Sequence, residues 1–178
     1  LFLKEHGAIV FNADKEAKKH LKNTSTLQNK IIEAFGQKVV ENNKLNLKKL
    51  AEVAFSNKLE QDILNGLMWP EVFMLTEKAI QKAEKENVKL FVLDAAMIFE
   101  ANFEHMLDMT LLISTRKNIR LTRALKRKNL PLEQIQNRMS LQMKETKKKE
   151  KADYIIENNA SKENFNKKLI NFYNTLPI

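Results

Sequence analysis

Four short apolar runs divide the chain and predict buried β-strands. Each run is too short for a helix, and none shows the strict apolar–polar alternation of a strand with one wet face. Strands that are apolar on both sides are typical of a parallel sheet with both faces covered. The predicted strands are residues 8–11, 88–93, 108–114 and 154–157.

Segments with helical spacing of apolar residues separate these strands. In residues 27–35, Leu27, Ile31 and Phe35 share one helical face, and Gly36 follows as a helix-ending glycine. The alternation of helices with strands predicts an α/β fold with a central parallel sheet. Helices are predicted for residues 1–6, 15–21, 27–35, 45–55, 61–87 with a break near Gly66 and Pro70, 117–128, 132–143 and 162–174.

Composition narrows the class of protein. The chain has 178 residues, of which 43% are hydrophobic, so one compact domain with its own core can form. It contains no cysteine, which excludes disulfides and thiolate metal sites. No apolar run approaches the roughly 20 residues that span a bilayer, and no secretory leader opens the chain. These features favour a cytoplasmic protein without a membrane partner.

The formal net charge of +9 favours an anionic partner, such as nucleic acid, an acidic membrane, a nucleotide or a phosphorylated metabolite. Of the 31 basic residues, 26 are lysines spread along the chain, which is typical of a solvated surface. The five arginines all lie between residues 116 and 138. Because arginine grips phosphate with two parallel hydrogen bonds, these five are the candidate anion-binding groups.

Carboxylates follow two of the predicted strands, at the edge where open parallel sheets bind ligands. Asp14 follows the first strand, where it could orient a substrate hydroxyl and accept its proton; an ordinary helix N-cap is the alternative. Asp94 ends the second strand and could hold magnesium, and Glu100 could do the same. A plain turn residue is the alternative for both, so the metal ligands stay unknown.

The arginines form a ridge on the predicted basic helix. Arg116, Arg120, Arg123 and Arg127 are spaced by four, three and four residues, which places them near one helical face. Their mutual repulsion would be relieved by a bound polyphosphate. Arg138 comes from the next helix, and two basic helices joined by a turn predict a lid that closes over a nucleotide. A solvated face with salt bridges is the alternative.

An ordered set of motifs resembles those of dephospho-coenzyme A kinases and covers nearly the whole chain. Residues 12–21 resemble D-A-D-x-x-x-x-x-x-L, residues 34–36 resemble R-F-G, and residues 45–57 resemble L-D-R-x-x-L-x-x-x-V-F-x-D/N. The later matches are residues 93–100 with L-D-V-P-L-L-F-E, residues 120–123 with R-L-x-x-R, residues 138–143 with R-I-x-x-Q-M, and residues 152–158 with A-D-x-V-I-x-N.

The resemblance implies the three-layer fold of P-loop nucleotide kinases, with a central parallel sheet, a helical insertion that binds the acceptor and a helical lid. The implied core consists of residues 1–22, 88–116 and 150–178. The implied insertion is residues 23–87, and the implied lid is residues 117–149.

The resemblance also implies an activity, the transfer of the ATP γ-phosphate to the ribose 3′-hydroxyl of dephospho-coenzyme A in the final step of coenzyme A biosynthesis. ATP and Mg²⁺ are the implied cofactors. Asp14 matches the family's catalytic base. The residues matched to the ATP site are Arg120, Arg123, Arg138 and Asn158, and those matched to the acceptor side are Asp94, Phe99 and Glu100.

Some features depart from the family pattern. The printed sequence has no G-x-x-x-S-G-K-S/T loop to cradle phosphates. We therefore expect about 20 residues of a strand–loop–helix to be missing, through truncation or disorder, and the printed chain by itself to be inactive. Residues 68–70 read M-W-P where the family has L-H-P, residues 95–98 read A-A-M-I where it has V-P-L-L, and Asn12 replaces the first Asp of D-A-D.

These departures leave two alternatives open. One is a kinase for another nucleoside or nucleotide. The other is a nucleic-acid-binding protein built on a kinase scaffold that has lost its phosphate loop. The net charge is the support for nucleic acid, and it is the less favoured partner because the aromatic residues mostly fall at core spacing.

Overall fold

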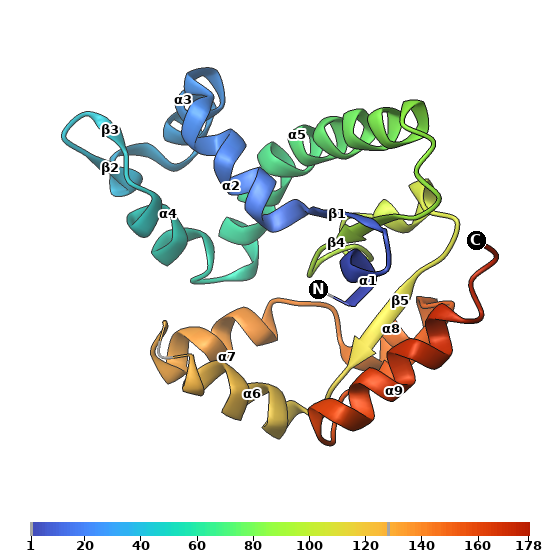
Figure 1. Ribbon diagram of the computed structural model, residues 1–178. Coiled ribbons are helices and arrows are strands. Elements are labelled where there is room, and N and C mark those ends of the chain that lie inside the picture. Colours follow the sequence, from blue (N-terminus) through green and yellow to red (C-terminus); the bar gives the residue numbers. More distant parts are fainter. Residues whose placement is uncertain (1, 128) are drawn as a thin grey trace.

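The computed structural model of the protein describes residues 2–127 and 129–178 (Figure 1). Leu1 and Lys128, which belong to two of the predicted helices, lie outside the described residues. The strands are β1 (Ile9–Asn12), β2 (Val40–Glu41), β3 (Lys44–Leu45), β4 (Phe91–Asp94), β5 (Leu111–Ser114) and β6 (Tyr154–Glu157). The helices are α1 (Phe2–Glu5), α2 (Ala13–Asn23), α3 (Ser25–Phe35), η1 (Gly36–Val39), α4 (Leu47–Ala54), α5 (Lys58–Lys85), η2 (Phe103–Met106), α6 (Lys117–Lys126), α7 (Leu132–Ser140), α8 (Glu145–Lys151) and α9 (Lys162–Tyr173).

Four strands pair in parallel, which confirms the predicted α/β class. β1 pairs with β4, so that Asn12 lies opposite Asp94, and β5 pairs with β6, so that Ser114 lies opposite Glu157. Within the described residues these are two separate pairs, and no ladder hydrogen bonds join them. Because paired parallel strands point the same way, each pair brings two loops together at its carboxyl end.

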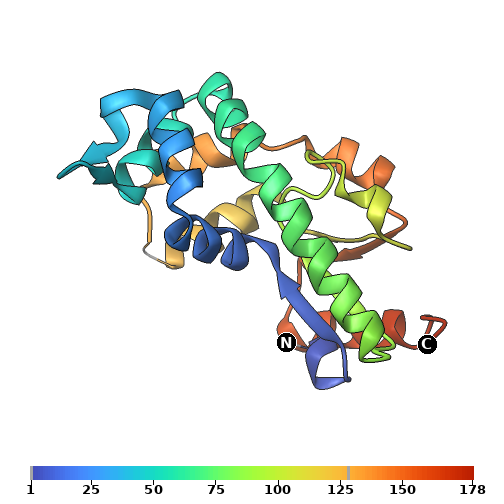
Figure 2. The same ribbon diagram turned by 90° about the horizontal axis from the view of Figure 1, so that it is seen from above.

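Helices α2 to α5 and the β2–β3 hairpin form a helical region on one side of the strands (Figure 1). Seen from above, the long helix α5 runs past both α2 and β1 (Figure 2). An apolar cluster holds these helices together, because burying one Leu, Ile or Val side chain contributes about 1.5–3 kcal/mol. The buried members of the cluster are Leu21, Leu27, Ile31, Phe35, Val39, Leu50 and Ala54.

A second apolar cluster attaches this helical region to the strands. Val72 of α5 and Phe103 of η2 pack with Ala13, the first residue of α2 after β1, and with Leu93 near the end of β4. The cluster therefore fixes the two strand ends from which Asp14 and Asp94 project.

Two features of the helical region differ from the prediction. Helix α5 continues through Gly66 and Pro70, so the predicted break is wrong. An internal proline costs a helix about 3 kcal/mol, and the packing of α2, α3 and α4 along α5 outweighs that cost. Residues 40–45 form a hairpin, although Leu45 was assigned to a helix. Its turn residues Asn42 and Asn43 have positive φ angles of 50° and 58°, as a two-residue hairpin requires.

The charged run 144–151 forms a helix of its own. Helix α7 ends at Ser140, and α8 covers Glu145–Lys151. Lys148 of α8 is only 8% exposed. The strands begin one to three residues later than predicted at β1, β4 and β5, whereas β6 has the predicted bounds.

Candidate active site

Two carboxylates meet where β1 and β4 end. Asp94 is the last residue of β4, and Asp14 lies in the first turn of α2. Asn12 caps that helix by accepting from the Lys15 N–H at 2.9 Å, and its Nδ2 donates to Oδ2 of Asp94, also at 2.9 Å. Because Asn12 is the N-cap, the alternative reading of Asp14 as a plain cap is wrong.

The environment of Asp14 suits a carboxylate that accepts a proton. Its side chain reaches solvent, but the protein around it displaces enough water to raise its pKa above the usual aspartate value. The negative charge of Asp94 raises that pKa further, while the backbone amide of Ala96 faces the carboxylate and lowers it. A raised pKa brings a general base closer to the pH at which it works.

Arginines from helices α6 and α7 line a cavity of about 460 Å³, which we call the arginine cavity. Arg120 and Arg123 come from α6 and Arg138 from α7, and Asn158 follows β6. Nη1 of Arg123 donates to the Asn158 carbonyl at 3.0 Å, which joins α6 to the loop after β6. The lining residues are Thr115, Arg120, Arg123, Ala124, Arg127, Leu130, Ile135, Arg138, Met139, Gln142 and Asn158.

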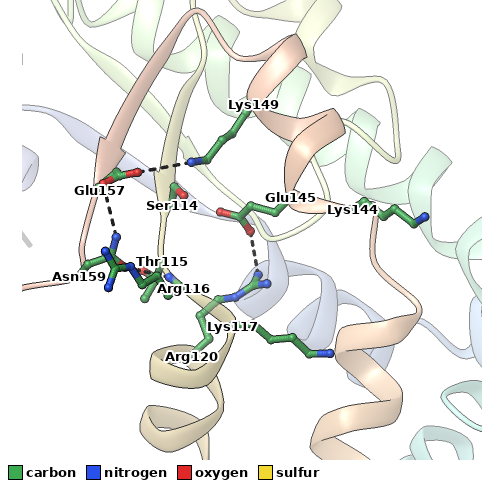
Figure 3. A pocket seen from close by; sticks show the side chains of 10 residues that line it. All are labelled: Ser114, Thr115, Arg116, Lys117, Arg120, Lys144, Glu145, Lys149, Glu157 and Asn159. Carbon is green, nitrogen blue, oxygen red and sulfur yellow. Dashed lines mark hydrogen bonds and ion pairs between the residues drawn. The ribbon is translucent and has the colours of Figure 1, made fainter.

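The fourth member of the predicted ridge lies elsewhere. Arg116 precedes α6 and lines a neighbouring cavity of about 360 Å³ (Figure 3). The two cavities share Thr115 and Arg120. Figure 3 shows Arg120 reaching toward Glu145 at the start of α8, and its Nη1 lies 3.1 Å from Oε2 of that residue. The ridge is therefore divided between two adjacent cavities.

Helix α7 also contacts the helical region formed by α2 to α5. The guanidinium of Arg138 lies over the ring of Phe55, with its carbon 4.3 Å from the ring centre. Burial of this guanidinium lowers the pKa of Arg138 from the usual arginine value. Phe55 caps the C-terminus of α4, so the contact joins α7 to α4.

Two of the residues assigned to the acceptor side have internal partners. Phe99 is 6% exposed, and Nζ of Lys151 lies 5.9 Å from its ring centre. Oε1 of Glu100 accepts from the Met143 N–H at 2.8 Å and lies 2.9 Å from Nζ of Lys148. Both side chains therefore support the loop after β4 from within the protein, whereas Asp94 is exposed.

Helix α8 connects the two parts of the candidate site. Its residue Glu145 pairs with Arg120 of the arginine cavity. One turn later, Lys148 donates to the carbonyl of Ala96, which follows Asp94 by two residues. Residues 2–127 and 129–178 contain no cluster of three or more His, Cys, Asp or Glu that would bind a metal without help from a ligand.

Three site residues were missed by the sequence analysis. Phe55 belongs to an apolar helix end, which is typical of core residues. Glu145 and Lys148 lie within a charged run, which is typical of a solvated surface. Their partners are distant in sequence, so nothing in the local pattern could have marked them.

Comparisons with known proteins agree with the motif resemblance. The sequence profile of a family described as dephospho-CoA kinase matches residues 1–164. The dephospho-CoA kinase of Salinibacter ruber is 33% identical over 173 residues, which are 97% of this chain and 87% of that protein. The dephospho-CoA kinase of Fusobacterium nucleatum is 30% identical over 176 residues, which are 98% of this chain and 89% of that protein.

Solved structures share the fold. A crystal structure from Thermus thermophilus matches with a TM-score of 0.78 and 26% identity, over 99% of this chain and 88% of that one. The dephospho-CoA kinase from Campylobacter jejuni matches with a TM-score of 0.66 and 28% identity, over 97% of this chain and 87% of that one. These matches confirm the predicted kinase-like fold. In the described part of the chain, no helix has the length and apolar character to cross a membrane.

Proposed function

The chain belongs to the dephospho-CoA kinase family, and from this premise we propose that it transfers the γ-phosphoryl group of ATP to the ribose 3′-hydroxyl of dephospho-coenzyme A. The observation that carries the proposal beyond family membership is the position of the exposed Asp14 carboxylate in the first turn of α2, beside Asp94 at the end of β4. Such a carboxylate can take the proton of an attacking hydroxyl.

In the proposed reaction the 3′-oxygen attacks the γ-phosphorus in line with the leaving group. Its proton passes to the Asp14 carboxylate, a bond forms between the 3′-oxygen and phosphorus, and the bond from phosphorus to the β,γ-bridging oxygen breaks to release ADP. Such a transfer needs little covalent catalysis by the protein, so the main contribution of Asp14 is to orient the hydroxyl.

The arginine cavity is the proposed site of the ATP phosphates. Guanidinium groups of Arg120, Arg123 and Arg138 line it, and they can neutralise charge that spreads over the transferring group. Asn158 lies at the same cavity, and we assign its loop to the adenine. The contact of Arg123 with the Asn158 carbonyl supports that assignment, because it holds the loop at a fixed position relative to the lid.

The end of the site that contains the carboxylates of Asp14 and Asp94 suits a bound Mg²⁺ ion. Mg²⁺ in phosphoryl-transfer sites is bound by one or two carboxylates together with phosphate oxygens and water. Asp94 is exposed, uses one oxygen to accept from Asn12, and repels the nearby charge of Asp14, so a cation beside it would be stabilised. When bound, the ion would neutralise phosphate charge. We assign Asp94 to this end and keep Phe99 and Glu100 as supports of the acceptor loop.

We assign a separate role to each of three parts of the chain. Residues 1–22, 88–116 and 150–178 form the core, residues 23–87 bind the acceptor, and residues 117–149 act as the lid. We place the reaction in the cytoplasm, where ATP is available.

The test uses the full-length protein encoded by the gene. Labelled ATP is offered with dephospho-coenzyme A and, in parallel, with nucleosides and nucleoside monophosphates, and the products are identified by mass. Preferred formation of coenzyme A supports the proposal. Preference for a nucleoside monophosphate would overturn the assigned acceptor.

The role of Asp14 is tested separately. Asp14→Asn should lower kcat about 10²- to 10⁴-fold and leave the Kd of ATP almost unchanged, because the carboxylate acts on the acceptor. Asp62→Asn, which removes an exposed carboxylate paired with Lys58, is the control and should be active. Full turnover by Asp14→Asn would exclude Asp14 as the base.

A further inference from the structure

Trp69 of α5 is the single tryptophan of the printed sequence, and it lies between the two apolar clusters without joining either. Leu67 and Met68 pack against the cluster of the helical region, and Val72 belongs to the cluster at the strand ends. Among the described residues, neither cluster includes Trp69, and its side chain is partly exposed. The largest apolar side chain of α5 therefore keeps part of its surface in contact with solvent.

The direction of α5 places Trp69 beyond the carboxyl ends of β1 and β4. The helix ends at Lys85, shortly before β4 begins, whereas Val72 packs with Leu93 near the end of β4. Helix α5 therefore runs antiparallel to β4, and Figure 2 shows the same relation to β1. Trp69 precedes Val72 by three residues and so lies roughly 4.5 Å further along the helix axis, past the strand ends. Open parallel sheets bind their ligands in this region.

Two contacts fix this turn of α5 against α2. Val72 packs with Ala13, the first residue of α2. Further along α2, Nε2 of His20 lies 2.9 Å from Oε2 of Glu71. Side chains three residues apart lie on neighbouring parts of a helix surface, so Trp69 projects from nearly the same side of α5 as Val72. Its ring therefore borders the first turn of α2, which contains the candidate base.

An indole ring at this place suits a purine. Aromatic side chains stack on nucleobases through their π faces, and tryptophan offers the largest face of the natural side chains. In dephospho-coenzyme A the hydroxyl that receives the phosphoryl group and the adenine are attached to the same ribose. When that hydroxyl reaches Asp14, the adenine must therefore lie within one sugar ring of the same carboxylate.

We propose that Trp69 recognises the adenine of the acceptor by stacking its indole ring on the purine. The inference rests on the proposed transfer to dephospho-coenzyme A. Because residues 68–70 read M-W-P where the family has L-H-P, the stacking is a property of this chain and is not implied by the resemblance. The stacked adenine holds the ribose in place while Asp14 orients its hydroxyl, so Trp69 contributes to the binding and selection of the acceptor.

The first experiment follows the tryptophan fluorescence of the full-length protein without ATP. Dephospho-coenzyme A should lower the emission along a saturable curve, because a stacked purine quenches indole. 4′-Phosphopantetheine, which is the acceptor without its adenosine part, should leave the emission unchanged. The same titration of Trp69→Phe should show no quenching, which assigns the signal to position 69.

The second experiment measures steady-state kinetics of full-length variants. Trp69→Ala should raise the KM of dephospho-coenzyme A about 5- to 150-fold, the range expected for the loss of one base–aromatic stack, and should keep the KM of ATP within about twofold. Trp69→Phe retains a stacking ring and should stay close to the wild type. Met74→Ala, which shortens an exposed apolar side chain on another side of α5, is the matched control and should keep both KM values.

Three results would overturn the inference. The first is an unchanged emission at saturating dephospho-coenzyme A. The second is equal quenching by 4′-phosphopantetheine, which would place the other end of the acceptor at Trp69. The third is an equal rise of the acceptor KM in Met74→Ala, which would indicate a general loss of packing along α5. Failure of the proposed function looks different, because the wild-type protein would then form no coenzyme A, whatever its fluorescence does.

Discussion

Arg138 of α7 stacks on Phe55 at the end of α4, with 4.3 Å between the guanidinium carbon and the ring centre. A cation–π contact of this kind contributes about 0.5–2 kcal/mol, depending on how much water is excluded. Arg138 also lines the arginine cavity. The guanidinium proposed to bind phosphate is thus oriented by a side chain from the region proposed to bind the acceptor.

Replacement of Phe55 tests this relationship. We expect Phe55→Leu to raise the KM of ATP roughly three- to tenfold, because about 1 kcal/mol of stacking no longer holds Arg138 over the ring. Phe55→Trp should keep the wild-type KM, since indole also stacks on guanidinium. Steady-state kinetics provide the measurement. Phe73→Leu, which removes a partly exposed ring of α5, is the control, and an equal effect there would assign the loss to general packing.

Glu145 is predicted to compete with phosphate for Arg120. The two side chains form an ion pair of 3.1 Å and are 38% and 25% exposed, so the pair contributes at most about 1 kcal/mol. Glu145→Gln should therefore tighten ATP binding by up to about fivefold, and the gain should shrink at high salt. Calorimetric titration measures it, with the exposed Glu133→Gln as control. Weaker binding by Glu145→Gln would instead show that Glu145 orients Arg120.

Ionised Asp14 should lower the free energy of unfolding at neutral pH. Its pKa is raised in the folded protein, so the folded state holds the proton to a higher pH than the unfolded state does. The favourable contribution is present below the unfolded value of about 3.9 and is lost as the pH rises through the folded value. We expect Asp14→Asn to have a higher Tm than the wild type at pH 7, and the difference to narrow toward pH 4. Thermal melts across this range test it, and an unchanged difference would contradict it.

Asp153 should have the opposite effect. Its pKa is lowered, first by the hydroxyl of Thr110 and then by the Thr110 N–H, which donate to Oδ2 at 2.8 and 2.7 Å. This stabilisation is present above the unfolded pKa and is lost as the pH falls through the lowered folded value. Asp153→Asn should therefore lower the Tm at pH 7, with a smaller difference below about pH 3.9. The exposed Asp108→Asn is the control; an equal loss there would assign the effect to net charge.

Much of the fold could be predicted because it depends on local patterns. The strand at residues 154–157 has the predicted bounds, and Gly36 ends its helix with a φ of 69°, a conformation that suits glycine. The spacing of Arg120 and Arg123 placed them together on one helix, and both line the arginine cavity. The motif resemblance is confirmed by the family match over residues 1–164. The individual site roles and the expectation of a missing phosphate loop stay predictions.

Other features could not be predicted because distant contacts decide them. Pro70 was expected to break α5, but the helices packed along it outweigh the local preference. Lys148 reads as one of many surface lysines, and burial follows from Glu100 and the Ala96 carbonyl, more than 40 residues away in the chain. Local sequence contains no information about partners at such separations.

The chain by itself determined the alternation of helices and strands, the placement of a carboxylate after β1 and a cluster of guanidinium groups in residues 116–138, because hydrophobic period and side-chain chemistry act over a few residues. Tertiary structure decided which of these groups meet. It placed Asp14 beside Asp94 through the pairing of β1 with β4, and Arg138 over Phe55 through the approach of α7 to α4. Proximity depends on packing and desolvation across the whole molecule, and these forces have no counterpart in local pattern.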